Sequence, residues 1–425
     1  MKTKNMIKGK VRLNDDKYND LIFFDDYKDI VKASENWVTS LKKYYKNVSS
    51  ENHSIDYKEK FMAGIERDDK VADVEDELSI KLIRCEFLSS TVDKKGEEDK
   101  TKRKRVVLQT GVHGIEGYVG ATLVDYFIKK ILKNLIFQDN LKFDLFIILN
   151  SNPFGVSFKR RVNENNVDLN RNFLLSEEDF NSFENNKQDQ NYKRIDRIVN
   201  LDINKSFKSQ NLFLLSASIA FKIIGFVMKK GASSFKNSLL SGQSYNTKGL
   251  YYRGSGYQVE TKVLLDIFKK ILNNDSILID LHTGYGPGYQ MSIVNSAFEP
   301  RTHEQIKLDF EYPLIVKSSS KDFYNISGDM IDYLYKNYIE KSRLKYATTF
   351  EFGTFGDSLI ASLKSVIAVA LENQNYFCKK NSKNIDKKIQ ELFRKAYYPE
   401  DKKWWNKAVY DFENAISSIC NFYLK

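Results

Sequence analysis

Five short hydrophobic runs predict buried β-strands, because runs of this length bounded by polar or glycine residues are typical of strands inside a sheet. They are residues 80–88, 106–111, 143–150, 276–284 and 346–354. Residues 27–46 and 120–135 carry hydrophobic side chains at helical spacing, and the second helix falls between two of the strands. A strand, a helix and a strand in this order predict parallel pairing. We therefore expect an α/β fold with a mixed, mostly parallel central sheet flanked by helices.

The segments around these strands predict one main domain with additions. Residues 81–380 contain all five strands and form the predicted main domain. Residues 1–80 are expected to be an N-terminal extension that packs on it, and residues 381–425 are expected to form C-terminal helices. Residues 174–245 separate the early strands from the late ones, so we interpret them as a helical insertion.

Two further segments have a distinctive composition. Residues 212–228 form the most hydrophobic run, but they contain Lys222 and are short for a membrane span, so we expect a buried or amphipathic helix. Residues 91–105 carry many charges between two predicted strands, which is typical of a solvated hairpin loop.

The overall composition excludes some classes of protein. The 425 residues carry a net charge of +11, from 67 basic and 56 acidic side chains that are interspersed. No zinc-finger, basic-zipper or aromatic RNA-binding signature is present, so we expect no nucleic-acid partner. Cys85, Cys378 and Cys420 are few and widely spaced, which favours a reducing compartment. No apolar core follows the basic N-terminus, so we expect a cytoplasmic protein without a membrane partner.

Histidine and glutamate occur together in GVHGIEG, residues 111–117, directly after a predicted strand. His113 stands three residues before Glu116, and His282 occupies a similar strand-end, glycine-rich position in IDLHTG. Two histidines and one glutamate are a common ligand set for catalytic Zn²⁺. An H-x-x-E pair occurs often by chance, and a lone histidine is usually an ordinary core or surface residue. Two of the four histidines in matching settings favour a metal site.

Two other segments place polar groups at the same edge of the predicted sheet. RRVNENNVDLNRNF, residues 160–173, packs arginines and amides behind a strand end, which is typical of a clamp for an anion. Glu351 lies in the strand segment TFEFGT. A buried carboxylate is costly unless it is paired or functional, so Glu351 either has a structural partner such as an arginine or acts in a reaction.

In this order, the motifs resemble those of the zinc metallocarboxypeptidase family. The matching motifs are H-x-x-E, R-x-N, D-L-N-R-N-F, a later strand-end histidine and a strand-borne glutamate. FYNISGDMIDY, residues 323–333, also resembles the family's pattern around the tyrosine of a mobile loop. The resemblance covers about residues 105–370 and is nearer to a bacterial branch than to the digestive enzymes. It implies that the main domain is a catalytic domain with a carboxypeptidase A-like fold.

The resemblance implies roles for the metal-site residues. His113, Glu116 and His282 would bind one Zn²⁺ per chain. Asp168 would orient His113 by a hydrogen bond to its ring. Glu351 would be the general base that activates the attacking water and passes its proton to the leaving amine.

The resemblance also implies roles in substrate binding. Arg161, at the R-x-N position, would polarise the scissile carbonyl and stabilise the oxyanion. Asn170 and Arg171 would hold the terminal carboxylate of the substrate. Tyr324 would close over the substrate, and Ile331 would lie at the base of the side-chain pocket.

The motifs are compatible with three functions. A zinc carboxypeptidase that acts on peptides with a free C-terminus fits them best. A zinc amidohydrolase of the same fold would use the same residues on N-acyl amino acids or peptidoglycan-derived peptides. A zinc-containing binding protein without catalysis is disfavoured, because Glu351 is present and has no use in binding alone.

Overall fold

The centre of the computed structural model is a mixed eight-stranded sheet with the strand order β1-β2-β4-β3-β5-β8-β6-β7. The structure describes residues 17–57, 77–87, 103–183, 187–200, 211–317, 327–378 and 383–425. The strands are β1 (Asn47–Ser54), β2 (Ser79–Glu86), β3 (Arg105–Thr110), β4 (Asp144–Leu149), β5 (Ser276–Thr283), β6 (Met291–Asn295), β7 (Ile315–Lys317) and β8 (Tyr346–Phe352).

Parallel pairing dominates the middle of the sheet. β3 is parallel to β4 and β5, and β5 is parallel to β8. These strands are buried along almost their whole length, which explains their continuous hydrophobic runs. Antiparallel pairs join β1 to β2, β2 to β4 and β8 to β6. The predicted mixed, mostly parallel sheet is confirmed.

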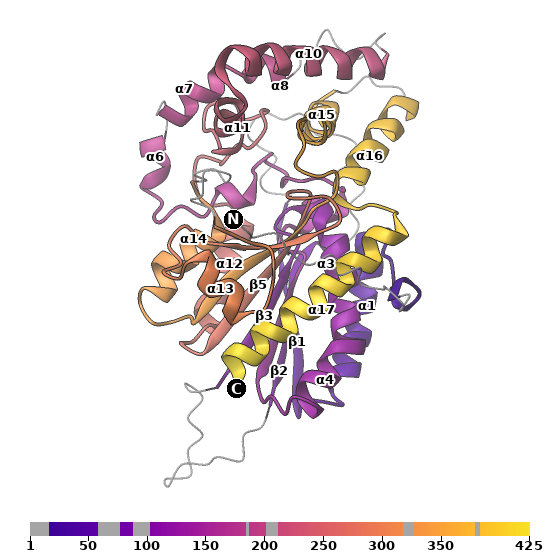
Figure 1. Ribbon diagram of the computed structural model, residues 1–425, viewed down its shortest axis with the longest axis vertical. Helices are drawn as coiled ribbons and strands as arrows, with labels where there is room; N and C mark the ends of the chain where they lie inside the picture. The colour runs from indigo at the N-terminus through magenta and orange to yellow at the C-terminus, as the bar shows by residue number, and fades with distance from the viewer. Residues whose placement is uncertain are drawn as a thin grey trace, which may run out of the picture.

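Helices cover the sheet and build a separate layer beyond its carboxyl edge (Figure 1). Next to the sheet are α1 (Tyr27–Leu41), α3 (Gly117–Tyr126), α4 (Leu132–Phe137), α5 (Pro153–Ser157), α12 (Val259–Ile271), α13 (His303–Asp309), α14 (Met330–Leu334) and α17 (Lys402–Leu424). The layer beyond the edge holds α6 (Asp179–Phe183), α7 (Lys187–Lys193), α8 (Asp196–Val199), α10 (Leu212–Lys230), α11 (Ala232–Leu240), α15 (Leu359–Tyr376) and α16 (Lys383–Tyr397).

The first described helix is fixed to the main domain by a specific contact. α1 begins after Asp26, whose side chain accepts a hydrogen bond from the Asp29 backbone and caps the helix. Its buried Trp37 donates from Nε1 to Asp125 of α3 at 2.8 Å. The described part of the N-terminal segment therefore packs on the same core as the sheet.

The hairpin expected between the second and third strands is wrong. β2 and β3 are not neighbours, because β4 lies between them, antiparallel to β2 and parallel to β3. A hairpin joins adjacent antiparallel strands, so β2 and β3 do not form one. Residues 88–102, which hold most of the charged connection between the two strands, lie outside the described residues.

The hydrophobic run of the insertion is a helix, α10, but it is largely exposed. Only Leu215, Ile219 and Ile223 of this helix are buried. Of the two alternatives, a buried or an amphipathic helix, the buried one is therefore wrong, because the described chain covers one side of α10 only. Within the described ranges, α10 is the one helix that is long and apolar enough to cross a membrane, with 17% of the tested window buried.

Candidate active site

Four candidate side chains meet at the carboxyl ends of three neighbouring parallel strands, the edge at which open α/β sheets build their sites. His113 follows β3 and precedes a single 3₁₀ turn that ends at Glu116. His282 lies in β5 and Glu351 in β8, and the two residues are directly paired in the register of the sheet. Residues distant in sequence thus come together because parallel strands end at one edge.

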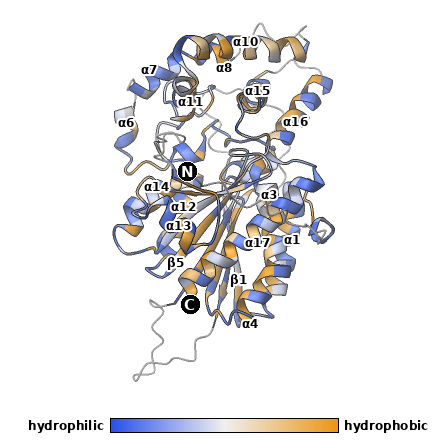
Figure 2. Cartoon of the chain, viewed as in Figure 1, coloured by the Kyte–Doolittle hydropathy of each residue, from blue (hydrophilic) through white to orange (hydrophobic). Residues whose placement is uncertain are grey.

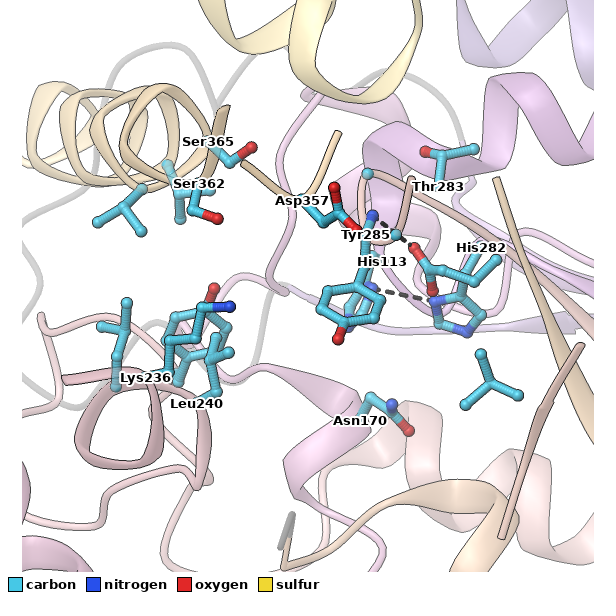
Figure 3. Close-up of a pocket in the computed structure, with 18 of the residues that line it drawn as sticks. His113, Asn170, Lys236, Leu240, His282, Thr283, Tyr285, Asp357, Ser362 and Ser365 are labelled. Atoms are coloured by element: carbon cyan, nitrogen blue, oxygen red, sulfur yellow. Dashed lines mark hydrogen bonds between the residues drawn. The ribbon is translucent and has the colours of Figure 1, made fainter. Parts of the chain in front are cut away.

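His113, Glu116 and His282 form a buried cluster with the geometry of a metal site. The Nδ1 atoms of the two histidines are 3.2 Å apart, as the dashed line in Figure 3 shows. Glu116 Oε1 lies 3.0 Å from His113 Nδ1, and Oε2 lies 3.2 Å from His282 Nδ1. Two ligands at roughly 2.0–2.1 Å from one tetrahedral ion are about 3.3 Å apart, so these atoms fit a small divalent cation.

Each potential ligand is oriented by a second polar group. Asp168 Oδ1 lies 3.1 Å from His113 Nε2, in the ring that the resemblance implied it would orient. Asp280 Oδ2 lies 2.6 Å from His282 Nε2. The backbone N–H of Thr283 donates to Glu116 Oε2 at 2.8 Å. In the tautomer with a proton on each Nε2, these carboxylates would accept it and both Nδ1 atoms would be free as ligands.

The charges of the cluster shift the pKa values of its members. Desolvation by burial raises the pKa of Glu116, but His113 and His282 outweigh it and hold this pKa below its usual value. Burial lowers the pKa of His282, but Asp280 and Glu116 outweigh it and raise the pKa. Burial and the nearby Glu116 charge raise the pKa of Glu351 to about 8. Glu351 is therefore the carboxyl of this group that holds a proton most easily.

Glu351 is buried beside the cluster without joining it. Its Oε1 accepts a hydrogen bond from the backbone N–H of Tyr285 at 2.9 Å. No arginine or lysine pairs with it among the described residues, so the structural explanation for a buried glutamate at this position is not supported. A carboxyl that is near a metal site but is not one of its ligands has the placement of a general base.

Of the two adjacent arginines, Arg161 faces the cluster. Its Nε donates to Asp168 Oδ2 at 3.1 Å, and its Nη1 donates to Glu116 Oε1 at 3.3 Å. Arg160 points elsewhere and pairs with the buried Glu372 at 3.0 Å. Arg161, which the resemblance placed at the R-x-N position, lines the cavity, and its role in the reaction stays a prediction.

Asn170 and Arg171 line the same cavity. The Asn170 side chain donates to Asp329 at 2.9 Å and accepts from the Met330 backbone, which fixes the amide at the start of α14. Arg171 donates from Nε to the Leu240 carbonyl and from Nη1 to the Asn170 carbonyl, both at 2.9 Å. Among the described residues, no hydrogen bond partner is found for its Nη2. That nitrogen therefore has donor capacity that the described chain does not use.

The two remaining predicted residues have different outcomes. Ile331 is buried at the start of α14 and lines the cavity, and its role at the base of a side-chain pocket stays a prediction. Tyr324 lies outside the described residues, so its position stays a prediction.

A family model for proteins of unknown function, DUF2817, matches residues 91–411. The chain belongs to the DUF2817 family. No curated protein matches the chain in sequence.

The DUF2817 chain is also similar to solved structures of other families. Bovine thrombin-activatable fibrinolysis inhibitor matches with 14% identity over 84% of this chain and 98% of that chain, at a TM-score of 0.42. Carboxypeptidase A of Helicoverpa armigera matches with 15% identity over 83% and 73%, at 0.40. A succinylglutamate desuccinylase of Silicibacter matches with 13% identity over 78% and 67%, at 0.33. At such values, the chemistry of the DUF2817 site has to be judged from its own residues.

Three residues of the DUF2817 site were missed by the sequence interpretation. Asp280 could have been found, because the alternation of a strand puts it on the same face as His282. Tyr251 lies 5.3 Å from the guanidinium groups of both Arg161 and Arg171, and it follows the insertion. Tyr397, at the end of α16, also lines the cavity. Nothing in the sequence near these two tyrosines connects them with strands that end far away along the chain.

Proposed function

We propose that this protein is a zinc-dependent hydrolase that cleaves the amide bond next to the terminal carboxylate of a peptide, the reaction of a carboxypeptidase. The observation that carries the proposal is the arrangement of His113, Glu116 and His282 at ligand spacing beside Glu351. Three ligands leave one coordination position open, as catalytic zinc sites require, and the fourth carboxylate remains available for proton transfer.

The chain's own atoms fit a zinc ion in this cluster. The Nδ1 atoms of both histidines lie beside Glu116, and with the Nε2 protons on the side of Asp168 and Asp280 the donor set would be two neutral imidazoles and one carboxylate. Such a set, with one ligand atom from each residue within 4.8 Å of the others, suits Zn²⁺. When bound, a zinc ion acts as a Lewis acid on a carbonyl oxygen and lowers the pKa of a coordinated water.

The surrounding side chains supply the remaining steps. Glu351 accepts a proton from the attacking water and delivers it to the leaving nitrogen. Its raised pKa of about 8 is caused by burial and then by the charge of Glu116, and a bound cation offsets the second cause. Arg161, which already bonds Asp168, stabilises the negative charge that develops on the carbonyl oxygen. Arg171 and Asn170 bind the substrate carboxylate, with Tyr324 expected to close over it.

A zinc amidohydrolase that acts on N-acyl amino acids is the second candidate. The same bond is broken and the same residues serve, because the carboxylate clamp recognises the amino acid and not the group on the other side of the bond. The observation that favours this candidate is the apolar lining of the cavity contributed by α10, α11 and α15. A peptide with an uncharged, apolar sequence would also fit such a lining.

The test combines metal content with product analysis. The purified wild type and a His113→Ala/His282→Ala double variant are analysed for zinc and then incubated with a mixed peptide library read by mass spectrometry. We expect one zinc per wild-type chain, and single residues released from C-termini by the wild type only. Zinc without trimming favours the amidohydrolase, and N-acyl amino acids are then the substrates to use. The same metal content in both proteins would refute the assignment of the ligands.

A further inference from the structure

The cavity extends away from the metal cluster between three helices, and this part of its lining is largely apolar. We call it the apolar arm. Its walls include Ile223 and Val227 of α10, Phe235 and Leu239 of α11, and Leu363 and Val366 of α15. Figure 3 shows Lys236 and Leu240 on one side of this space, Ser362 and Ser365 above it, and His282 at the opposite end.

The chemistry of amide hydrolysis does not explain the apolar arm. Metal binding, proton transfer and the carboxylate clamp need polar side chains, and those lie at the sheet edge. Ile223, Phe235 and Leu239 are buried, so the wall toward the cavity is a fixed part of the layer. Three helices of this layer contribute apolar side chains to one continuous space that begins at the reacting groups.

The two ends of the cavity suggest how a substrate lies in it. Asn170 and Ile331 line the cavity at the start of α14, and the proposed function puts the carboxylate of the substrate beside Asn170. The apolar arm leads away on the side of α11 and α15. A chain attached to the acyl carbon of the cleaved bond therefore runs along the apolar arm.

We propose that the substrates are amino acids N-acylated with a long alkyl chain, and that this chain lies in the apolar arm. The proposal rests on the proposed function. One water is consumed: the amide C–N bond breaks, the oxygen of water joins the acyl carbon to give a fatty carboxylic acid, and a proton goes to the nitrogen of the released amino acid. Burial of each further methylene should strengthen binding by about fourfold until the arm is filled.

Binding can be measured apart from turnover. In the Glu351→Gln protein, the dissociation constants of one amino acid carrying an acetyl, an octanoyl or a myristoyl group are measured by titration calorimetry. We expect affinity to rise by at least about a hundredfold from the acetyl to the myristoyl compound. Equal affinities for the three compounds would overturn the proposal, whatever the catalytic activity.

Substitutions in the apolar arm test whether the dependence of affinity on acyl chain length arises there. Val366→Trp fills the arm, and Leu363→Asp puts a charge into it at a half-buried position that is more tolerant of a polar group. Either change should remove the advantage of the long chain and leave the acetyl compound unaffected. Leu308→Trp, at a residue 78% exposed on α13, is the matched control and should change nothing. Long-chain affinity unchanged in both arm variants would refute the assignment.

Turnover of the same series separates this inference from the proposed function. Cleavage of the acetyl compound or of short peptides, without a preference for long chains, would leave the proposed function standing and overturn the apolar arm. Chain-length-dependent binding without cleavage by the zinc-loaded wild type would support the apolar arm as a binding site and overturn the proposed function.

The outer face of α10 carries a second, independent inference. Leu214, Phe221, Ile224 and Met228 project outward at helical spacing, with exposed fractions of 61%, 79%, 40% and 82%. α10 lies at one end of the molecule, with the rest of the described chain on one side of it (Figure 1), and it is largely hydrophobic in Figure 2. An apolar face of this kind marks a surface that meets a partner.

The charges on and near α10 indicate which partner this is. The helix contains no acidic residue, and Lys222, Lys229 and Lys230 are exposed along it. Lys193 and Arg194 are exposed at the end of α7, which is connected to α10 through α8. Apolar side chains bordered by lysines are typical of helices that lie in the surface of an anionic membrane.

We infer that the outer face of α10 binds the surface of an anionic lipid bilayer. The buried inner side of the helix stays packed on the protein, so the helix lies in the plane of the interface. This differs from the sequence-based expectation of no membrane partner, and the binding does not depend on what the active site does. The full chain is sedimented with phosphatidylcholine vesicles, with or without phosphatidylserine, and its mass in solution is measured by light scattering.

We expect co-sedimentation with phosphatidylserine vesicles that is lost in a Phe221→Asp/Met228→Asp variant and weakened in Lys222→Gln. Leu308→Asp, an equally exposed leucine on α13, should bind as the wild type does. No sedimentation of the wild type with either kind of vesicle would overturn the inference. A wild-type dimer that the double variant abolishes, without lipid binding, would identify the face as a self-association surface instead.

Discussion

His282 and Glu351 face each other across the β5–β8 ladder, at directly paired positions of two parallel strands. One residue belongs to the metal cluster and the other does not, although they are neighbours in the sheet. The ladder therefore fixes the distance between a ligand and the proposed base without any contribution from loops. Rigid placement of this kind is what a proton transfer at a metal site needs.

Replacement of Glu351 by glutamine should separate metal binding from catalysis. Because Glu351 is not a member of the cluster, Glu351→Gln should keep its zinc. Loss of the general base should lower kcat by about 10²–10⁴-fold. Metal analysis and steady-state kinetics on the same preparation check both expectations. A variant with wild-type turnover would show that Glu351 is not the base.

Asp280 should tune the metal affinity through His282. Its carboxylate bonds the Nε2 of this ring at 2.6 Å, so Asp280→Asn weakens the force that holds the proton there. We expect the zinc dissociation constant to rise by about 10–100-fold, measured by competition with a chelator. Asp266→Asn, an exposed aspartate on α12, is the control. Equal zinc affinity in both variants would argue against a role for Asp280.

Arg171 should provide the preference for a free carboxylate. Arg171→Met removes the Nη2 donor, and a lost hydrogen bond to a charged group costs about 1.5–3 kcal/mol. We expect the wild type to cleave a substrate with a C-terminal carboxylate in preference to its carboxamide, and the variant to lose this preference. Two bonds of Arg171 to backbone carbonyls also support the fold, so a thermal melt accompanies the kinetics. A folded Arg171→Met variant that still prefers the carboxylate substrate to the carboxamide would contradict the role of Arg171 in binding the carboxylate.

Gly114 should be indispensable for the turn between His113 and Glu116. A Cβ at this position would lie 1.9 Å from the Gly155 backbone, which cannot move away as a side chain could. Gly114→Ala should lower the free energy of unfolding by about 1–3 kcal/mol and reduce zinc binding. Gly225→Ala is the control, because no atom of the described residues lies within 4 Å of its added Cβ. Denaturant unfolding and zinc titration of both variants test the expectation.

Asp332 should make the stability of the protein dependent on pH. Burial and then the neighbouring Asp329 raise the pKa of Asp332 to about 7. The folded state therefore holds this proton more tightly than the unfolded state, and the stability that it contributes is lost as the pH rises from about 4 to 7. Asp332→Asn should flatten this part of the curve of unfolding free energy against pH, measured by denaturant titration. A curve unchanged from the wild type would exclude Asp332 as its source.

The local sequence determined where strands and helices form, and it indicated a metal site. Hydrophobic runs such as residues 143–150 mark buried strands because a strand covered on both faces has no polar side. His113, Glu116 and His282 were recognisable because ligand side chains at strand ends are unusual in a chain with only four histidines. Arg161 was preferred to Arg160 because the family resemblance assigns the R-x-N position to it.

Tertiary structure decided what depends on packing between distant segments. The register that pairs His282 with Glu351, the insertion of β4 between β2 and β3, and the approach of Tyr397 to the site are set by contacts that no local pattern encodes. The exposure of α10 also depends on contacts with distant segments. Its hydrophobic sequence does not show whether another layer of the protein covers it. Periodicity records which side chains share a face, and only the folded chain determines what that face meets.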